Sequence, residues 1–438
     1  MPTPLLSGRD VARSVLVRVV EDGAYASRAL SAALDRARAL PPEERALATE
    51  LVYGTLRRQA RLDRALEAVS DRGLGGLDIR VRIALRVAAY QILFLDRIPA
   101  YASVSEAVDA CKRLRGRGMA GLANALLRRL AERGEPPLPD PARDPLAYLV
   151  EAAGFPPWLA QLTMAELPPD EVVAFADAST APAPLSVRAN TLRLDRDTLR
   201  ARLLEERPGA TVTATPLAED ALLIRDMDSP FLTSAWRDGL FAVADIGAQM
   251  VVALAGAKPG ETILDACAGV GGKSAQLAAL AGNQATIEAL DISASKLGQA
   301  EELFRRLGVR GISTRTGDLL HPLPDASRRY HRVLLDAPCA GLGVLRRHPE
   351  ALARLQPDDL TTLAARQLTM LGTVAPLVLP GGTLTYSVCT FDRAEGEDVV
   401  QLFLATHPAF EVAESPLRTY PHRHDADAFF AVRLRANS

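Results

Sequence analysis

The sequence predicts a chain of several domains: an all-α bundle at the front, a small α/β module, and an open, mostly parallel α/β sheet at the back. At 438 residues the chain is too long for one ordinary domain. Over the first third, apolar residues recur at three- and four-residue spacing, which is typical of helices. From about residue 240 onward, strand-like runs alternate with helical patterns, which indicates βαβ units.

The composition limits the class of protein. Apolar residues make up 48% of the chain, enough for sizeable cores. No apolar run has transmembrane length, and residues 1–10 lack the basic start and apolar core of a secretory signal. The four cysteines are too few for a disulfide framework, and their spacing fits no zinc site. We therefore expect a cytoplasmic protein with neither a membrane span nor a metal.

Residues 1–140 are predicted to form a bundle of about six helices. Pro41-Pro42-Glu43-Glu44 is a typical helix start, with proline and acids in the first turn. Apolar spacing predicts helices over 9–20, 27–39, 41–57, 79–96, 103–114 and 121–130. Cys111 lies on an apolar-patterned helix, where a packing role is expected.

The net charge of −2 conceals an asymmetry. Residues 1–140 hold 23 Lys and Arg against 17 Asp and Glu, a net of +6, and the remainder holds 28 against 36, a net of −8. No acid lies between Asp109 and Glu132, and we expect residues 115–118 there to form a loop. A solvated helix face would explain a basic cluster, but positive charges without one negative favour contact with RNA or DNA. The basic residues of this stretch are Lys112, Arg113, Arg115, Arg117, Arg128 and Arg129.

Residues 141–240 are predicted to form a linker and a small α/β module. Prolines crowd the segment 136–145, which marks an extended domain boundary. Helical patterns follow at 157–162, 169–175 and 195–206, and strand-like runs at 185–192, 210–215 and 221–224. Arg188 and Asn190 suit contact with RNA as well as they suit a structural role.

The domain at 241–438 contains a glycine-rich turn, residues 268–272, between a strand at 262–267 and a helix at 273–280. Glycines let a ligand approach the backbone, and a helix N-terminus favours negative charge. The spacing is not that of a dinucleotide fingerprint. It is not that of an ATP-binding loop either, because no glycine lies five positions before Gly272. Nucleotide hydrolysis is therefore disfavoured.

Aspartates close three successive strands: Asp291, Asp318 and Asp336. One aspartate at a strand end is often an ordinary turn former. Three of them behind a glycine turn suit the ribose and base of a nucleoside. Because the chain has no dedicated diphosphate cradle, this pattern points to S-adenosylmethionine as the cofactor.

Two cysteines follow strand ends fifty positions apart. Cys339 closes Asp336-Ala-Pro-Cys339, and Cys389 lies in Tyr386-Ser-Val-Cys-Thr390. Ligands bind beyond the carboxyl ends of strands in open parallel sheets, so both thiols are expected at one edge. Buried core thiols are the alternative.

Several of these segments resemble known families. The segments 50–57 (ELVYGTLR) and 124–129 (NALLRR) resemble the NusB-type helical RNA-binding domain. The segments 265–273, 336–349 and 386–390 resemble the RNA cytosine-5 methyltransferases, and with the NusB-like front the chain resembles their Sun/Fmu branch. That resemblance implies a Rossmann-like methyltransferase domain, S-adenosylmethionine as methyl donor, and small-subunit (16S) ribosomal RNA as the partner. Apart from the resemblance, we expect a monomer.

The resemblance also implies residue roles. Cys389 would be the nucleophile that adds to cytosine C6, Cys339 would help release the product, and Asp336 is our candidate acid near N3. Arg346 and Arg347 would clamp RNA phosphate or lower a thiol pKa. Val270 stands where the family usually carries proline, which frees φ and is expected to loosen the turn. The cofactor would be held by Cys267, Ala268, Gly269, Val270, Gly271, Gly272, Lys273, Asp291, Asp318 and Asp336.

Two alternatives stay open. A DNA or transfer RNA cytosine-5 methyltransferase is the first; the DNA enzymes attack with a Pro-Cys cysteine, which would make Cys339 the nucleophile. The second is a non-catalytic RNA-binding ribosome assembly factor that keeps a vestigial cofactor fold. The two cysteine motifs, Asp336 and the glycine turn weigh against it.

Overall fold

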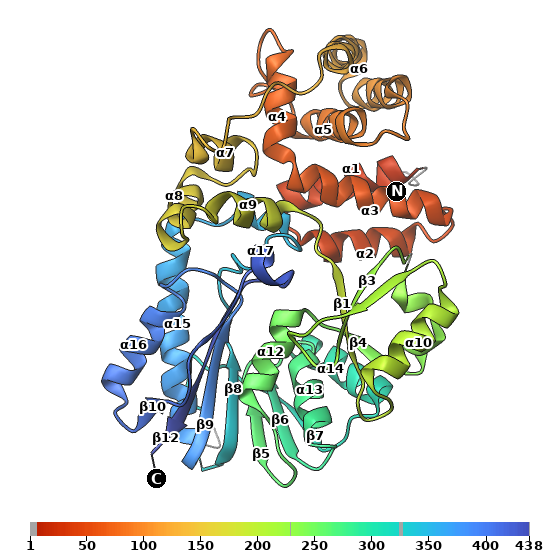
Figure 1. Ribbon diagram of the computed structural model, residues 1–438. Helices are drawn as coiled ribbons and strands as arrows, with labels where there is room; N and C mark the ends of the chain where they lie inside the picture. Colours follow the sequence, from red (N-terminus) through yellow and green to blue (C-terminus); the bar gives the residue numbers. More distant parts are fainter. Residues whose placement is uncertain (1–6, 228, 324–326, 438) are drawn as a thin grey trace. The chain divides into compact units, whose positions relative to one another are not determined.

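The computed structural model describes residues 7–227, 229–323 and 327–437 (Figure 1). It divides into two compact units. The helical unit comprises Met1–Ala181 and Leu345–Leu355, and the sheet unit comprises Pro182–Val344 and Gln356–Ser438. Residues 1–6, which bear on the expectation of no secretory signal, lie outside the described residues. Within the described ranges, no helix combines the length and apolar character needed to span a bilayer.

The helical unit is built around α5 (Ile79–Phe94), which is buried on nearly every face between Val81 and Gln91. A helix that is buried on nearly every face belongs in a core, and other helices of the unit pack around it. These are α1 (Gly8–Glu21), α3 (Pro42–Arg57), α4 (Gln59–Ala68) and α6 (Ala100–Arg133), while α2 (Ala26–Arg36) packs on α1 and α3. The unit continues with α7 (Pro145–Glu151), α8 (Pro157–Glu166) and α9 (Val172–Thr180). The predicted bundle is confirmed, and α7 begins at Pro145, the last proline of the proline-rich segment, whose other residues are in no helix or strand.

The predicted loop at residues 115–118 is wrong. A single non-helical residue, Gly116 with φ +80° and ψ −170°, stands between two helical stretches of α6. Glycine adopts positive φ without steric cost, so one residue is enough to kink the helix. Lys112, Arg113, Arg115 and Arg117 remain exposed around this kink.

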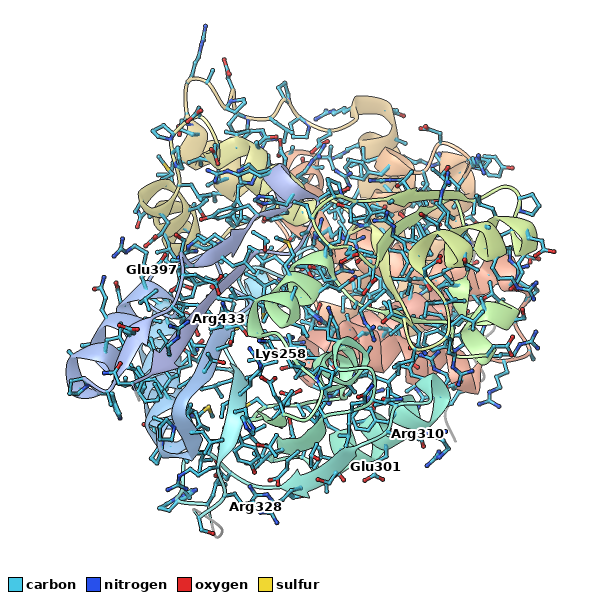
Figure 2. The ribbon with its side chains drawn as sticks, turned by 60° about the horizontal axis from the view of Figure 1, so that its bottom comes forward. Lys258, Glu301, Arg310, Arg328, Glu397 and Arg433 are labelled. Atoms are coloured by element: carbon cyan, nitrogen blue, oxygen red, sulfur yellow. The ribbon has the colours of Figure 1, made fainter. Side chains whose placement is uncertain are left out.

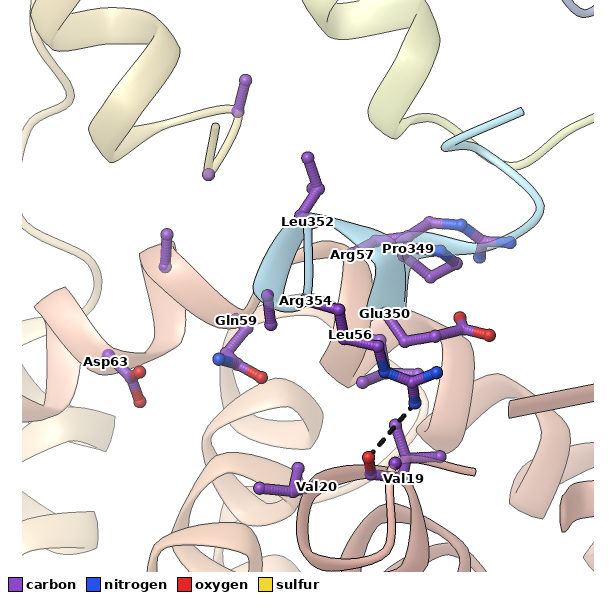
Figure 3. A pocket seen from close by; sticks show the side chains of 15 residues that line it. Val19, Val20, Leu56, Arg57, Gln59, Asp63, Pro349, Glu350, Leu352 and Arg354 are labelled. Atoms are coloured by element: carbon purple, nitrogen blue, oxygen red, sulfur yellow. Dashed lines mark hydrogen bonds between the residues drawn. The ribbon is translucent and has the colours of Figure 1, made fainter. Parts of the chain in front are cut away.

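A segment from the middle of the sheet unit's sequence belongs to the helical unit. Residues 345–355, which contain the 3-10 turn Pro349–Ala353, pack against α1, α2 and α3. Figure 3 shows Arg354 donating to the carbonyl of Val19 at 3.2 Å beside a cavity of about 470 Å³. The Ala26 amide donates to the Glu350 carboxylate at 3.0 Å.

The sheet unit contains two sheets. The smaller is antiparallel, in the order β2 (Thr211–Ala214), β3 (Ala221–Arg225), β1 (Leu185–Ala189), β4 (Phe241–Val243), with α10 (Arg196–Glu206) and α11 (Ser234–Arg237) beside it. Its Asn190 donates to the carbonyls of Gly239 and Leu307, both at 2.8 Å. The three predicted domains thus differ from the two compact units, because α7–α9 pack with the bundle and this sheet packs with the larger one.

The larger sheet has the order β10-β12-β9-β8-β5-β6-β7, with β11 paired to β12. The strands from β7 to β9 are parallel, and β12 runs antiparallel to β9. The strands are β5 (Thr262–Asp265), β6 (Thr286–Asp291), β7 (Ile312–Thr316), β8 (Tyr330–Asp336), β9 (Val378–Val388), β10 (Phe410–Val412), β11 (Leu417–Thr419) and β12 (Phe429–Ala436). Lys258, Arg310 and Arg328, labelled in Figure 2, precede β5, β7 and β8 and mark the amino-terminal edge.

Helices cover both faces of this sheet, because alternate residues of each strand face opposite sides. Ile263 and Leu334 pack under α12 (Ile246–Ala255) and α13 (Gly272–Leu280). Leu264 and Val333 pack under α15 (Pro357–Val374) and α16 (Glu397–Thr406). The remaining helices are α14 (Ala294–Leu307) and α17 (Pro421–His424). The predicted Rossmann-like α/β sheet is confirmed, whereas α15 and α16 were not predicted.

Candidate active site

A cavity of about 690 Å³ opens at the carboxyl ends of β5, β6, β8 and β9. Of the residues assigned to the cofactor or to catalysis, all but Gly271 line it: Cys267, Ala268, Gly269, Val270, Gly272, Lys273, Asp291, Asp318, Asp336, Cys339 and Cys389. Parallel strands end at one edge of a sheet, which is why residues spread over 120 positions of sequence meet there. The structure therefore brings the predicted cofactor and cysteine residues together.

The glycine turn is shaped by positive-φ residues and tied to β6. Gly269 and Gly271 have φ of +56° and +82°. The Gly269 amide donates to Asp291 Oδ2 at 2.9 Å, and the Ser293 amide donates to Asp291 Oδ1 at 2.8 Å. Gly271 faces away from the cavity, where a Cβ would lie 2.7 Å from the Ala300 Cβ.

The turn fits a nucleoside cofactor. A Cβ built on Gly269 or Gly272 would meet nothing within 4 Å, so both glycines leave the backbone open to the cavity. Each Asp291 oxygen accepts one backbone bond and keeps a lone pair for a ribose hydroxyl. Asp318 accepts from the Leu320 amide at 2.9 Å and likewise keeps acceptor capacity at the cavity. The open backbone at the two glycines and the carboxylate acceptors suit S-adenosylmethionine.

Asp336 is held by two side chains. Lys273 Nζ donates to its Oδ2 at 2.7 Å, and Ser387 Oγ donates to its Oδ1 at 2.7 Å. Burial alone would lower the pKa of Lys273, but the charges of Asp336, Asp265 and Cys389 raise it overall. Lys273 therefore stays an ammonium and forms an ion pair with Asp336 on the cavity wall.

The two cysteines are in direct contact, with 3.3 Å between the Sγ atoms of Cys339 and Cys389. Hydrogen bonding to Cys389 and then burial raise the pKa of Cys339 well above its ordinary value. Cys339 therefore keeps its proton and can donate it toward Cys389. Burial also raises the pKa of Cys267, and it raises that of Cys111 in the helical core to about 11, so neither favours the thiolate.

Asp265, the last residue of β5, is hydrogen-bonded to the helix that follows the glycine turn. It is fully buried, and the Ser274 hydroxyl donates to its Oδ2. Burial raises the pKa of this carboxyl to about 6. Its other oxygen has no hydrogen-bond partner among the described residues.

Several cavity-lining residues were missed by the sequence interpretation. Leu363, Arg366 and Met370 come from α15, and Ile292, which is 66% exposed, follows Asp291. The sequence does contain a signal for the start of α15: Gln356 and Asp359, whose side chains form a capping box, lie on either side of Pro357 at the first helical position.

The arginines assigned to RNA divide into two groups. Arg113 and Arg115 are exposed and pair with Asp10 and Asp78 on the helical unit, and Lys112 and Arg117 are exposed beside them. Arg188 is 1% exposed, donates to the Ala189 carbonyl, and has its pKa lowered to about 10 by burial.

Two further arginines lie on the segment that packs with the helical unit. Arg346 is 3% exposed, and its carbonyl accepts from Arg57. Among the described residues, the cavity lining includes neither Arg346 nor Arg347, and it does not include Arg188. Arg188 and Arg346 are therefore too deeply buried to contact an RNA phosphate, and the expectation that they bind RNA is not supported.

Comparison with known proteins gives three family models. They are described as 16S rRNA methyltransferase RsmB/F over residues 251–435, NusB family over 7–132, and an RsmF/B-like methyltransferase ferredoxin-like domain over 155–228. The chain is 32% identical to the probable ribosomal RNA small subunit methyltransferase B of Bacillus subtilis, over 98% of each chain. It is 37% identical to the ribosomal RNA small subunit methyltransferase B of Thermus thermophilus, over 98% of this chain and 97% of that one.

A solved structure agrees with these matches. The crystal structure of a protein called PH0851 aligns with a TM-score of 0.81 and 25% identity, over 98% of this chain and 99% of that one. The resemblances drawn from the sequence motifs, at the NusB-like front and in the cysteine-bearing segments, are thereby confirmed.

Proposed function

Because this chain belongs to the 16S rRNA methyltransferase RsmB/F family, we propose that it methylates C5 of a specific cytosine in small-subunit ribosomal RNA through a covalent adduct between Cys389 and C6. The enzyme is an S-adenosylmethionine-dependent rRNA methyltransferase. We further propose that it acts as a monomer in the cytoplasm. The observation that carries the C5 proposal is the pair of thiols 3.3 Å apart beside Asp336 at one cavity edge.

The chemistry requires a nucleophile because cytosine C5 is unreactive by itself. Cys389 Sγ, as the thiolate, adds to C6 with its own electron pair, and the ring becomes an enamine whose C5 carries the displaced electron pair. Thiolates suit this step because they are strongly nucleophilic and can later leave. S-adenosylmethionine, when bound, supplies the electrophilic methyl group.

Asp336 and Lys273 are placed to compensate the negative charge that develops on the ring. Addition at C6 pushes negative charge toward N3, so an acidic group must stand there. The Lys273–Asp336 pair, joined at 2.7 Å, can present a proton to N3 and take it back as the ring regains aromaticity. The bond from Ser387 holds the Asp336 carboxylate in one orientation.

Cys339 is assigned to product release. After methylation the C5 proton leaves to a base, the ring becomes aromatic again, and the bond between C6 and Cys389 breaks. Cys339 is a protonated thiol 3.3 Å from the leaving sulfur, so its S–H can stabilise the departing thiolate. The Cys389 thiolate can therefore leave without a water molecule to stabilise it.

For the RNA we propose the exposed basic stretch on α6, Lys112, Arg113, Arg115 and Arg117, as a phosphate contact. Positively charged residues around a kink can follow a curved phosphate backbone. The target base must leave any stacked structure to reach the cavity.

The test uses labelled S-adenosylmethionine with small-subunit ribosomal RNA that lacks the modification. Labelled 5-methylcytosine in digested RNA supports the proposal. Its absence both with naked RNA and with ribosomal particles favours the assembly-factor alternative. DNA and transfer RNA serve as competing substrates. We expect C389A to form no covalent RNA adduct, C339A to accumulate one, and C111A, in the helical core, to behave as wild type. The opposite pattern for the first two variants would make Cys339 the nucleophile.

A further inference from the structure

Behind the two sulfur atoms lies a cluster of buried polar side chains that the reaction above does not use. It consists of Gln367 on α15, Tyr386 on β9 and Glu395 in the loop after β9, each 0% exposed. Burying such groups is costly unless they are hydrogen-bonded. Their partners are the backbone groups on both sides of Cys339 and each other.

Two hydrogen bonds fix the chain around Cys339. Gln367 Nε2 donates to the Pro338 carbonyl at 3.0 Å. The Ala340 amide donates to the Glu395 carboxyl group, at 3.0 Å to Oε1 and 3.2 Å to Oε2. Gln367 Nε2 also donates to Glu395 Oε1 at 2.8 Å, so the two side chains brace one another.

The same cluster reaches the strand that carries Cys389. The Tyr386 hydroxyl, three residues before Cys389, is shared between Gln367 Oε1 at 3.0 Å and the Glu395 carbonyl at 2.6 Å. Farther along, the Gly343 amide donates to the Cys389 carbonyl at 3.0 Å. The segments that bear the two sulfurs are therefore tied together through one set of bonds.

We propose that Glu395, braced by Gln367 and Tyr386, is a positioning residue that sets the separation of the Cys339 and Cys389 sulfur atoms. Among the described residues that line the cavity none of these three occurs, so their effect passes through the backbone at 338–340. The catalytic consequence of this inference rests on the proposed function, whereas the sulfur separation itself does not.

The protonation of Glu395 decides which substitution imitates it. Burial, and next the charge of Asp392, raise the pKa of Glu395 to about 8, so the side chain is mostly neutral at pH 7. Oε1 accepts from both Ala340 and Gln367. The E395Q side chain keeps a neutral group with an oxygen at that place, whereas E395A removes the acceptor. Glu397, labelled in Figure 2, is bound to Arg418 and supplies a matched control, E397A.

The first measurement needs no RNA. A diazene oxidant such as diamide takes two hydrogens from a pair of thiols as the S–S bond forms and is itself reduced to a hydrazine. The rate of disulfide formation between Cys339 and Cys389, followed by peptide mass mapping, reports how closely the sulfurs approach. A second measurement follows methyl transfer to RNA, with kcat and KM for S-adenosylmethionine determined separately, and thermal melting checks folding.

We expect E395A to oxidise at least about tenfold more slowly and to lose about a hundredfold in kcat, with KM unchanged, because a misplacement near 1 Å costs that much. E395Q and E397A should match wild type, and Y386F, which removes only the hydroxyl, should be intermediate. Wild-type oxidation and turnover in E395A would overturn the proposal, as would equal losses in E395Q and E395A. If E395A does not fold, the rates of disulfide formation in Y386F and E395Q are compared instead. Slower oxidation in Y386F than in E395Q supports the proposal, and equal rates overturn it. A wild-type protein that forms the disulfide but makes no 5-methylcytosine would refute the proposed function and leave the positioning role intact.

Discussion

Replacing each of two adjacent glycines of the glycine turn by alanine should have a different effect, one on stability and one on cofactor binding. Gly271 has φ +82°, and a Cβ there would lie 2.7 Å from both the Ala300 Cβ and the Phe304 ring. Gly272 begins α13, and a Cβ there would meet nothing within 4 Å and would enter the cavity. One substitution therefore strains the fold, and the other fills space that a ligand needs.

The magnitudes follow from these contacts. A left-handed conformation costs an L-residue about 1–2 kcal/mol, and overpacking a core costs about 1–3 kcal/mol more, so G271A should lose about 2–5 kcal/mol. That loss lowers the melting temperature by roughly 4–20 °C in a domain of this size. G272A should not destabilise the fold, since alanine is the better helix former. It should weaken S-adenosylmethionine binding at least about tenfold, which corresponds to about 1.4 kcal/mol.

Thermal unfolding by circular dichroism and cofactor binding by calorimetry measure the two effects separately. G372A, on α15 where a Cβ would meet nothing within 4 Å, is the control that should keep both stability and binding. The reasoning is refuted if G271A melts at the wild-type temperature. It is also refuted if G272A binds the cofactor as tightly as wild type.

Three further predictions concern other parts of the molecule. Because burial raises the pKa of Asp265 from 3.8 to about 6, its contribution to stability is greatest below pH 4 and falls as the pH rises to 6. D265N should therefore gain melting temperature relative to wild type over that interval, and a constant difference would contradict this. R354A removes the donor to two backbone carbonyls and should cost about 1–3 kcal/mol in urea unfolding; an unchanged midpoint would contradict the packing of residues 345–355. R113A and R117A should each weaken RNA binding. Each should also reduce by about 1 the slope of the logarithm of the association constant against the logarithm of the salt concentration, whereas R188A should leave that slope unchanged.

The parts of the site that the sequence predicted are those with local signals. The glycine turn, the helix after it and the strand-end aspartates were placed within one or two residues, because strand, turn and helix start each have a short-range pattern. The meeting of Cys339 and Cys389 followed from parallel topology, in which strand ends share an edge.

The remaining features depend on packing between distant residues. Arg188 lies on an alternating strand, and nothing in the alternation says that this side chain turns into the core. Gln367 and Glu395 are ordinary polar residues in the sequence, and only the fold gives them the backbone of Cys339 as partner. The kink of α6 needs one glycine at positive φ, whereas the Gly-rich pattern suggested a whole loop.

The segment that follows the Cys339 motif connects the two units through the chain itself. Cys339 is held by Glu395 and Gln367 in the sheet unit, and six residues later the chain enters the helical unit, where Arg57 donates to the Arg346 carbonyl. Because the bonds around 338–340 are buried and satisfied, they fix the backbone on both sides of Cys339 within the sheet unit.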